Sequence, residues 1–376
     1  MRASLRLLKL AQSVQKGPCM NLNLTKTLAL PLSLDEVTPD WLSRALSDRF
    51  PGIEISSVER EGERSGTSSS AQFNLTYAQK PEGAPSSVYI KGGFDEIMRK
   101  RVWAALIQEA RFYAELAPEV PVPVPAVYFA GIDEEARQGV LIMEDMRQRG
   151  IRFGHITQDV SVDTVAEIIT AQARLHAHFW KDPRLEAYRE WAEPARAFVR
   201  YLYREKHWDH VNQRSYASMI PHVLPDREFA LAATERLWKI NAQAPQTLLH
   251  GDCHVGNLYF HPDGSPGFMD WQCTFPGTPG HDHAEMINCA LDTQSRRENE
   301  RDLLKLYRSV LVECGVSDAP GEEEIFLSYR QNQMHLMGFS VMNPYDMQTV
   351  EVTDTAAVRA LEAAIDLDMI GALGLR

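Results

Sequence analysis

The segment LLHGDCHVGNLYF at 248–260 concentrates polar residues that could do chemistry between two apolar stretches. Asp252 and Asn257 lie on one predicted loop, and Asp270 ends the apolar segment GFMDW, which follows a turn at HPDGSP. Because a strand–turn–strand hairpin brings its two ends together, we expect Asp270 to return to the side of Asn257. Carboxylate and amide oxygens suit Mg²⁺. Asp252 would then face a substrate hydroxyl, which is the division of labour that phosphoryl transfer requires.

The histidines of the same region allow another interpretation. The pattern H-x-D-x-H at 250–254, with His261, His281 and His283 further along, could bind zinc as in a metal-dependent hydrolase. A polar turn without chemistry is a third interpretation of the segment taken alone. The zinc interpretation leaves the polar residues in the first half of the chain without a role.

A lysine and a glutamate in that first half form a second candidate group. Lys91, in VYIKGG, is the only lysine inside an apolar strand pattern, and a buried ammonium needs an anionic partner. Glu109 falls among Leu106, Ile107 and Phe112 on the following predicted helix, where an unpaired carboxylate would also be costly. We therefore predict an ion pair between Lys91 and Glu109. Its alternative is an ordinary half-buried pair of modest energetic worth.

The elements that must position these residues change in character along the chain. Strand-like patterns punctuated by turns run from 53 to 93, a helix is predicted over 96–116, and a proline-rich connector, APEVPVPVP, ends it. Residues 126–146 are typical of a hairpin. After residue 150 the periodicity is mostly helical, as in TVAEIITAQARLHAHFW. Thr38 is predicted to cap a helix with Pro39 in its first turn, and Asp354 to cap a final helix.

The motifs together resemble a known superfamily. H-G-D-x-H-x-G-N followed by an apolar-Asp-Trp segment is similar to the aminoglycoside phosphotransferase/choline kinase superfamily, the small-molecule branch of the protein-kinase-like fold. GERSGTSSS, LIMED and HGDCHVGNLYF are most similar to bacterial ecdysteroid-kinase-like phosphotransferases. The resemblance implies an α+β fold of two lobes. We expect an N-terminal extension at 1–30, a small antiparallel-sheet lobe at 31–146, and a larger, mainly helical lobe at 147–376.

The resemblance also implies a role for each candidate residue. Asp252 would be the catalytic base, and Asn257 and Asp270 would be the Mg²⁺ ligands. Lys91 would hold the α- and β-phosphates of ATP, paired with Glu109. These assignments agree with the chemistry expected from the residues themselves.

Two further segments would complete a nucleotide site. GERSGTSSS lacks the three spaced glycines of protein kinases, but its hydroxyls and backbone N–H groups can still donate to phosphate oxygens, through Gly66, Thr67, Ser68 and Ser69. LIMEDM matches the hinge between lobes, where main-chain groups near Glu144, Asp145 and Met146 would bond the purine. Asp282, in GHDHAEM, matches a family aspartate that we expect to brace the catalytic loop.

The acceptor is expected to be a small hydroxylated molecule. Aromatic and methionine-rich stretches at 188–210 and 334–347 would favour a bulky apolar alcohol such as a steroid, lipid or secondary metabolite, if some of them line the cleft. An aminoglycoside or other amino sugar is the alternative, and it would require several carboxylates. A non-catalytic nucleotide-binding protein is the alternative from another class.

Composition limits the remaining classes of function. A formal net charge of −12 argues against nucleic-acid binding, which needs a basic face. No apolar run approaches the roughly 20 residues that span a bilayer. Five widely spaced cysteines without a C-x-x-C pair fit a reducing cytoplasm. The sequence leaves a monomer and a homodimer equally open.

Overall fold

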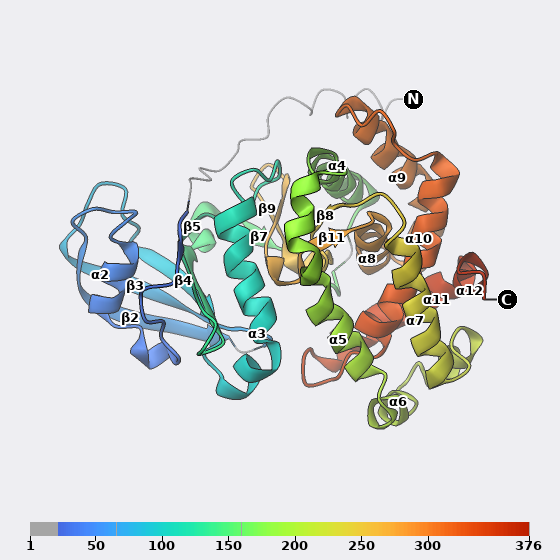
Figure 1. The fold of residues 1–376 in the computed structure, drawn as a ribbon, viewed down its shortest axis with the longest axis horizontal. Helices are drawn as coiled ribbons and strands as arrows, with labels where there is room; N and C mark the ends of the chain where they lie inside the picture. Colours follow the sequence, from blue (N-terminus) through green and yellow to red (C-terminus); the bar gives the residue numbers. More distant parts are fainter. Residues whose placement is uncertain (1–21, 65, 159, 376) are drawn as a thin grey trace.

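The computed structural model describes residues 22–64, 66–158 and 160–375, which form two lobes (Figure 1). The smaller lobe contains a six-stranded sheet in the order β1-β5-β6-β4-β3-β2. Its strands are β1 Leu24–Thr25, β2 Glu54–Arg64, β3 Ser69–Gln79, β4 Ser87–Gly92, β5 Val127–Asp133 and β6 Gln138–Glu144. The expected extension at 1–30 lies outside the described residues as far as residue 21.

The sheet is antiparallel as expected except at one edge. β2 to β6 pair antiparallel, but β1 pairs parallel with β5, with Leu24 opposite Ala130. The last part of the expected extension therefore belongs to this sheet. A two-residue strand is too short to show alternation, which is why the sequence pattern gave no sign of it.

Helix α2, Pro39–Leu46, begins as predicted. The Thr38 hydroxyl accepts a hydrogen bond from the Trp41 N–H at 3.2 Å, and Pro39 occupies the first turn. Trp41 then packs edge-on against Phe129 of the sheet. These contacts close the sheet face that points away from the larger lobe.

Helix α3, Glu96–Arg111, lies on the other side of the sheet, between the two lobes in Figure 1. The predicted continuous helix at 96–116 is interrupted. Val102 has non-helical backbone angles, and the final turn, Phe112–Leu116, is a π-helix. Such wide turns are frequent at functional sites, and this one sets the position of Phe112.

The apolar side chains of β6 alternate between two cores. Val140 and Ile142 belong to a core shared with α2, whereas Leu141 and Met143 belong to the larger core that continues through α3 into the second lobe. This period of two is what a strand buried on both faces requires. The sheet is thereby packed against the helical lobe through α3.

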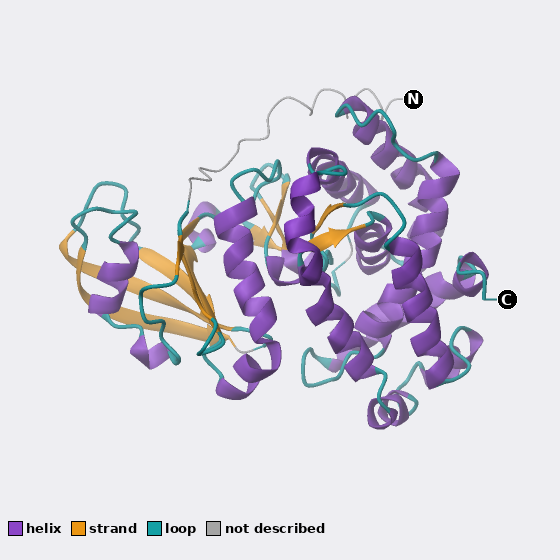
Figure 2. Cartoon of the chain, viewed as in Figure 1, coloured by secondary structure: helices purple, strands orange, loops and turns teal. Residues whose placement is uncertain are grey.

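The larger lobe is mainly helical (Figure 2). Two small sheets, β10-β9-β7 and β11-β8, interrupt the helices. The helices are α4 Val162–His178, α5 Glu193–Leu202, α6 Glu205–Val211, α7 Arg227–Asn241, α8 Gly280–Ala290, α9 Thr293–Glu313, α10 Glu322–Leu336, α11 Val350–Asp366 and α12 Met369–Ala372. The strands are β7 Arg152–Phe153, β8 Thr247–Leu249, β9 Leu258–Phe260, β10 Pro266–Phe268 and β11 Phe275–Gly277. None of the helices in the described part of the chain combines the length and hydrophobicity of a bilayer-spanning segment.

The prediction that Asp354 caps the final helix is wrong. α11 begins at Val350, and its cap is Thr349, whose side chain accepts from the Val352 N–H. Asp354 lies one turn inside, where it accepts hydrogen bonds from Ser215 at 2.8 Å and Tyr345 at 2.7 Å. Threonine and aspartate both suit a cap, and tertiary partners decided between them.

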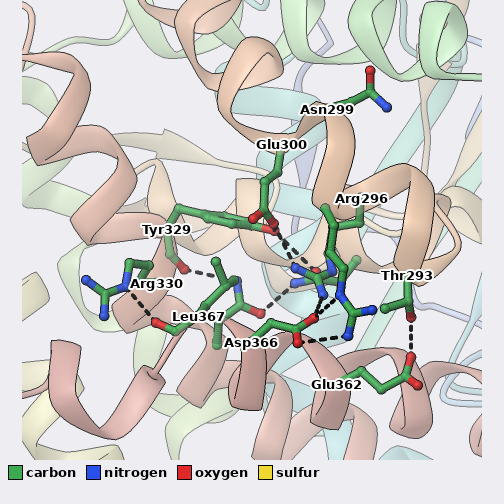
Figure 3. Close-up of polar contacts among 12 residues, drawn as sticks. Thr293, Arg296, Asn299, Glu300, Tyr329, Arg330, Glu362, Asp366 and Leu367 are labelled. Carbon is green, nitrogen blue, oxygen red and sulfur yellow. Dashed lines mark hydrogen bonds and ion pairs between the residues drawn. The ribbon is translucent and has the colours of Figure 1, made fainter.

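A buried arginine ties α9, α10 and α11 together (Figure 3). Arg296 is 1% exposed and donates to Glu300 at 2.9 Å and to Asp366 of α11. Tyr329 of α10 donates to the same Glu300 at 3.1 Å. Arg297, which is largely exposed, also binds Asp366. The Arg296 guanidinium therefore links two carboxylates from different helices, and Arg297 shares Asp366 with it.

We predict that Arg296→Met destabilises the protein by about 3–5 kcal/mol, because it leaves buried carboxylates without their cation. Arg297→Met is the matched control, since Arg297 meets the same Asp366 from solvent. It should cost much less. Chemical denaturation of the three proteins measures the difference, and equal losses for the two variants would contradict the special role of Arg296.

Candidate active site

A cavity of about 1660 Å³ lies between the lobes, and nearly all of the predicted site residues line it. They come from the β2–β3 loop, β4, α3, the β6 hinge and the two loops of the larger lobe that flank β9 and β10. The lining residues among them are Gly66, Thr67, Ser68, Lys91, Glu109, Glu144, Asp145, Met146, Asp252, Asn257 and Asp270.

The Lys91 ammonium joins the two lobes at this cavity. It donates to Glu109 of α3 at 2.8 Å and to Asp270 of the larger lobe at 2.8 Å. The Lys91 side chain is 12% exposed and that of Glu109 only 3%, so both charges are largely removed from water. The predicted Lys91–Glu109 pair is present, and Asp270 forms a third member.

This group contains one ammonium and two carboxyl groups. Burial alone would lower the pKa of Lys91, but the two carboxylates raise it and keep the ammonium charged. Burial raises the pKa of Glu109 above its ordinary value, although Lys91 opposes this shift. One ammonium thus serves two carboxylates, and Asp270, which is more exposed, faces the cavity.

Backbone and aromatic contacts place Asp270. Its φ of 63° lies in the left-handed region, which aspartate tolerates better than most residues. The next residue, Trp271, is buried and stacks on Phe112 at 4.1 Å between ring centroids. Its indole N–H donates to the Phe268 carbonyl, and its backbone N–H lies against Glu109, where it lowers the pKa of that carboxyl. The π-helical turn of Phe112 and the Asp-Trp pair therefore position Asp270 next to Lys91.

The loop before Asp252 is held from behind by Asp282 of α8. The Asp282 carboxylate accepts from the His250 N–H at 2.9 Å and the Gly251 N–H at 3.0 Å, and it lies 3.3 Å from His176 of α4. Burial alone would raise the pKa of Asp282, but the hydrogen bond with His176 and the neighbouring imidazoles lower it. The predicted bracing role agrees with these contacts.

Gly251 allows the chain to turn there. Its φ is +80°, and a Cβ atom would lie 2.0 Å from the Cys273 carbonyl oxygen. No side chain fits at this position without moving the Asp270–Cys273 segment. The glycine therefore lets the Asp252 loop approach the Asp270 loop closely.

Asp252 is oriented by its neighbours. Asn257 donates to its carboxylate at 3.0 Å and to its backbone oxygen at 2.8 Å. His254 Nδ1 accepts from the Gly256 N–H at 3.0 Å, and its Nε2 lies 3.8 Å from Asp252. The side chain of Asp252 is 17% exposed, toward the cavity. A carboxylate held this way can accept a proton from a bound hydroxyl.

Comparison with known proteins then identifies the kind of site. Residues 98–310, more than half of the chain, match the phosphotransferase enzyme family. The chain belongs to this family. The match includes Glu109, Asp252, Asn257 and Asp270, whereas Lys91 lies just before it. No curated protein is significantly similar to the phosphotransferase described here.

This phosphotransferase is similar to solved structures over most of their length. LicA in complex with AMP has a TM-score of 0.50 and 15% sequence identity, over 88% of this chain and 98% of that one. The choline kinase LicA from Streptococcus pneumoniae has a TM-score of 0.49 and 14% identity, over 87% and 98%. A spectinomycin phosphotransferase in complex with ADP and spectinomycin has a TM-score of 0.46 and 13% identity, over 86% and 97%. The predicted two-lobe α+β, protein-kinase-like fold is confirmed by the likeness to LicA in complex with AMP and by the sheet and helices of the two lobes. The closer similarity to ecdysteroid-kinase-like phosphotransferases stays a prediction.

Ser69 is the predicted site residue that the structure does not place on the cavity. It is 5% exposed and absent from the lining, whereas Ser68, Ser70 and Gln72 line it. Successive side chains of a strand point to opposite faces, so the run of serines divides between the two sides. Alternation along β3 could have identified Ser70 as a cavity residue in place of Ser69. The Ser70 hydroxyl lies 2.7 Å from that of Tyr89.

The hinge residues are held by structural contacts. Glu144 accepts from the Ala126 N–H and pairs with Arg149, and Asp145 accepts from the Ser87 hydroxyl at 2.9 Å. The Glu144 N–H itself donates to the Ala126 carbonyl. The side chains of Glu144 and Asp145 therefore fix the shape of the hinge.

The predicted zinc alternative does not form. His250 donates to the Met269 carbonyl through Nε2 at 3.0 Å, as a brace for the loop. Within the described ranges, the one group with metal-ligand spacing is His281, Glu285 and His335, whose donor atoms lie within 4.8 Å of one another. Sequence analysis missed Glu285, which also lines the cavity.

We predict that Asp282→Asn destabilises the phosphotransferase by about 1–3 kcal/mol, since an amide cannot serve both backbone N–H groups and His176 equally. Asp292→Asn is the control. It changes the exposed cap of α9, where asparagine substitutes well for aspartate. Thermal or urea unfolding measures both. A fully stable Asp282→Asn protein would contradict the bracing role.

Proposed function

We propose that this phosphotransferase moves the γ-phosphoryl group of ATP to a hydroxyl of a small molecule. The observation that carries the proposal is the 2.8 Å contact of the Lys91 ammonium with Asp270, on the cavity that Asp252 and Asn257 also line. A cation from one lobe and oxygen ligands from the other can surround a triphosphate between them. Lys91 would bind the phosphates, with Glu109 holding its ammonium in place.

The donor set fits Mg²⁺. The Asn257 amide donates both of its hydrogen bonds to Asp252 through its nitrogen, so its oxygen can face a cation, as can the second oxygen of Asp270. Asn257 and Asp270 would hold the ion, which would neutralise charge on the phosphates. Lys91 pairs with two carboxyl groups, Glu109 and Asp270, and the remaining negative charge favours such a cation.

The chain's own residues would carry the proton and orient the reactants. Asp252 takes the proton of the acceptor hydroxyl as its oxygen bonds to the γ-phosphorus. The bond from that phosphorus to the β–γ bridging oxygen breaks, and ADP leaves. Gly66, Thr67 and Ser68 would cover the phosphates, and the main chain of Asp145 and Met146 would meet the purine.

The acceptor we propose is a bulky apolar alcohol. Aromatic and apolar side chains form much of the cavity on the side of the larger lobe: Ile156, Trp191, Phe198, Tyr201, Phe339, Met347 and Val352. Glu193 also lines it but pairs with Arg196 at 2.7 Å, so it is poorly placed to bind an ammonium. Glu190 in the same wall favours the second candidate, an amino sugar.

Asp252→Asn should lower ADP release from Mg-ATP about 10²- to 10⁴-fold, because the amide cannot accept the proton. Nucleotide affinity should stay close to that of the unchanged protein, since Asp252 faces the acceptor. Calorimetry with Mg-ATP and a coupled ADP assay test both statements. Near-normal turnover would refute the assignment. Nucleotide binding without turnover in the unchanged protein, with any acceptor, would indicate a non-catalytic nucleotide-binding protein.

The substrate class has its own test. In a panel of hydroxylated steroids, lipid alcohols and aminoglycosides, we expect the apolar alcohols to stimulate ADP release above the level with water alone. Trp191→Ala should reduce that stimulation while leaving the basal rate unchanged, because Trp191 lies on the acceptor side. Stimulation by aminoglycosides alone would favour the second candidate.

A further inference from the structure

Glu285 is a buried carboxyl group directly behind the proposed base. It lies on α8 one turn after Asp282, is 3% exposed and lines the cavity. Its Oε2 accepts a hydrogen bond from the Cys253 N–H at 2.7 Å. Asp282 holds the backbone before Asp252, and Glu285 holds the backbone after it. Two carboxyl groups of α8 therefore accept hydrogen bonds from the loop backbone on both sides of Asp252.

The Glu285 carboxyl also meets the side chain of Asp252. The two carboxyl groups are close enough to interact, and the charge of Asp252 helps to raise the pKa of Glu285. A hydrogen bond between two carboxyl groups needs a proton on one of them, because two carboxylates only repel. Asp252 has the more exposed side chain and takes a hydrogen bond from Asn257, so it suits the anionic form. Glu285 is then the carboxylic acid.

The surroundings of Glu285 favour this acid form. Burial and the charges of Asp252 and Asp282 raise its pKa. Burial lowers the pKa of both His281 and His335, so these rings supply no cation at neutral pH. Among the described residues, the hydrogen bond that Glu285 accepts comes from the Cys253 backbone and not from a lysine or arginine. The titratable groups around it are Asp252, Cys253, Cys273, His281, Asp282, Cys289 and His335.

We propose that Glu285 is a positioning residue for the catalytic base. Its acid O–H donates to Asp252 while its other oxygen holds the Cys253 N–H. The carboxylate of Asp252 is thereby fixed from behind by Glu285 and from the side by Asn257. The inference rests on the proposed function, because it presupposes that Asp252 is the base.

Glutamine and leucine separate the two possible roles of this side chain. Glu285→Gln keeps a donor for Asp252 and an acceptor for Cys253, whereas Glu285→Leu keeps the apolar volume and loses both. With Mg-ATP and water as the acceptor, Glu285→Leu should lower the rate of ADP release roughly 10- to 100-fold, the usual cost of a misplaced reactive group. Glu285→Gln should restore most of that rate, and the KM for ATP should change little in either variant.

The pH dependence of ADP release separates the two roles, because it would not change if Glu285 only supported the fold. The pKa of Glu285 is raised, and the proposed donor is lost as the pH rises through the folded-state value. ADP release by the unchanged protein should therefore fall at alkaline pH, and Glu285→Gln should lack this fall. The infrared band of a protonated carboxylic acid should be present at neutral pH and missing in Glu285→Gln.

Three results would overturn the inference. Glu285→Gln could be as slow as Glu285→Leu, or its pH profile could match that of the unchanged protein. Elemental analysis after chelation could instead find one tightly bound zinc that Glu285→Gln loses, in which case His281, Glu285 and His335 bind a metal and Glu285 is no donor. Should Glu285→Leu fail to fold, the profile of Glu285→Gln still decides. Asp252→Asn, run in parallel, separates this failure from failure of the proposed function, because only the latter leaves Asp252→Asn active.

Discussion

The contact of one buried ammonium with carboxylates from two lobes is the constraint on which the site depends. Lys91 sits on a strand of the small lobe, and its partners come from α3 and from the loop after β10. A buried ammonium without partners would be strongly destabilising. The sheet, α3 and the Asp270 loop must therefore keep their relative positions, which holds Glu109 and Asp270 at the cavity between the lobes.

In the larger lobe, buried carboxyl groups hold the backbone of the loop that carries Asp252. Asp282 accepts the N–H groups of His250 and Gly251, and Glu285 accepts that of Cys253. The short segment around Asp252 carries no regular hydrogen-bond ladder of its own, and its buried N–H groups need acceptors. Two carboxyl groups one turn apart on α8 supply them, and the loop is fixed without covering the face that points into the cavity.

Apolar packing explains why this polar site can exist between the lobes. β6 sends alternate side chains into two cores, and α3 carries the larger core from the sheet to the helical lobe. Phe112 and Trp271 stack at the junction. The polar groups thus lie at the edge of a continuous apolar body, where a low local dielectric strengthens their interactions.

The sequence by itself determined the elements and the chemistry that they carry. Alternation, helical periodicity and turn residues located the strands from β2 to β6, α2 and α4, and the spacing of Asp252, Asn257 and Asp270 indicated phosphoryl transfer, because each of these signals is local. Tertiary structure decided which distant groups meet. Glu285 lies behind Asp252, and His176 beside Asp282, only because α4 and α8 pack against the same loop, and no local pattern records that packing. The parallel pairing of β1 and the position of Ser69 facing away from the cavity likewise depend on which strand lies next to which, a choice made by the burial of whole faces.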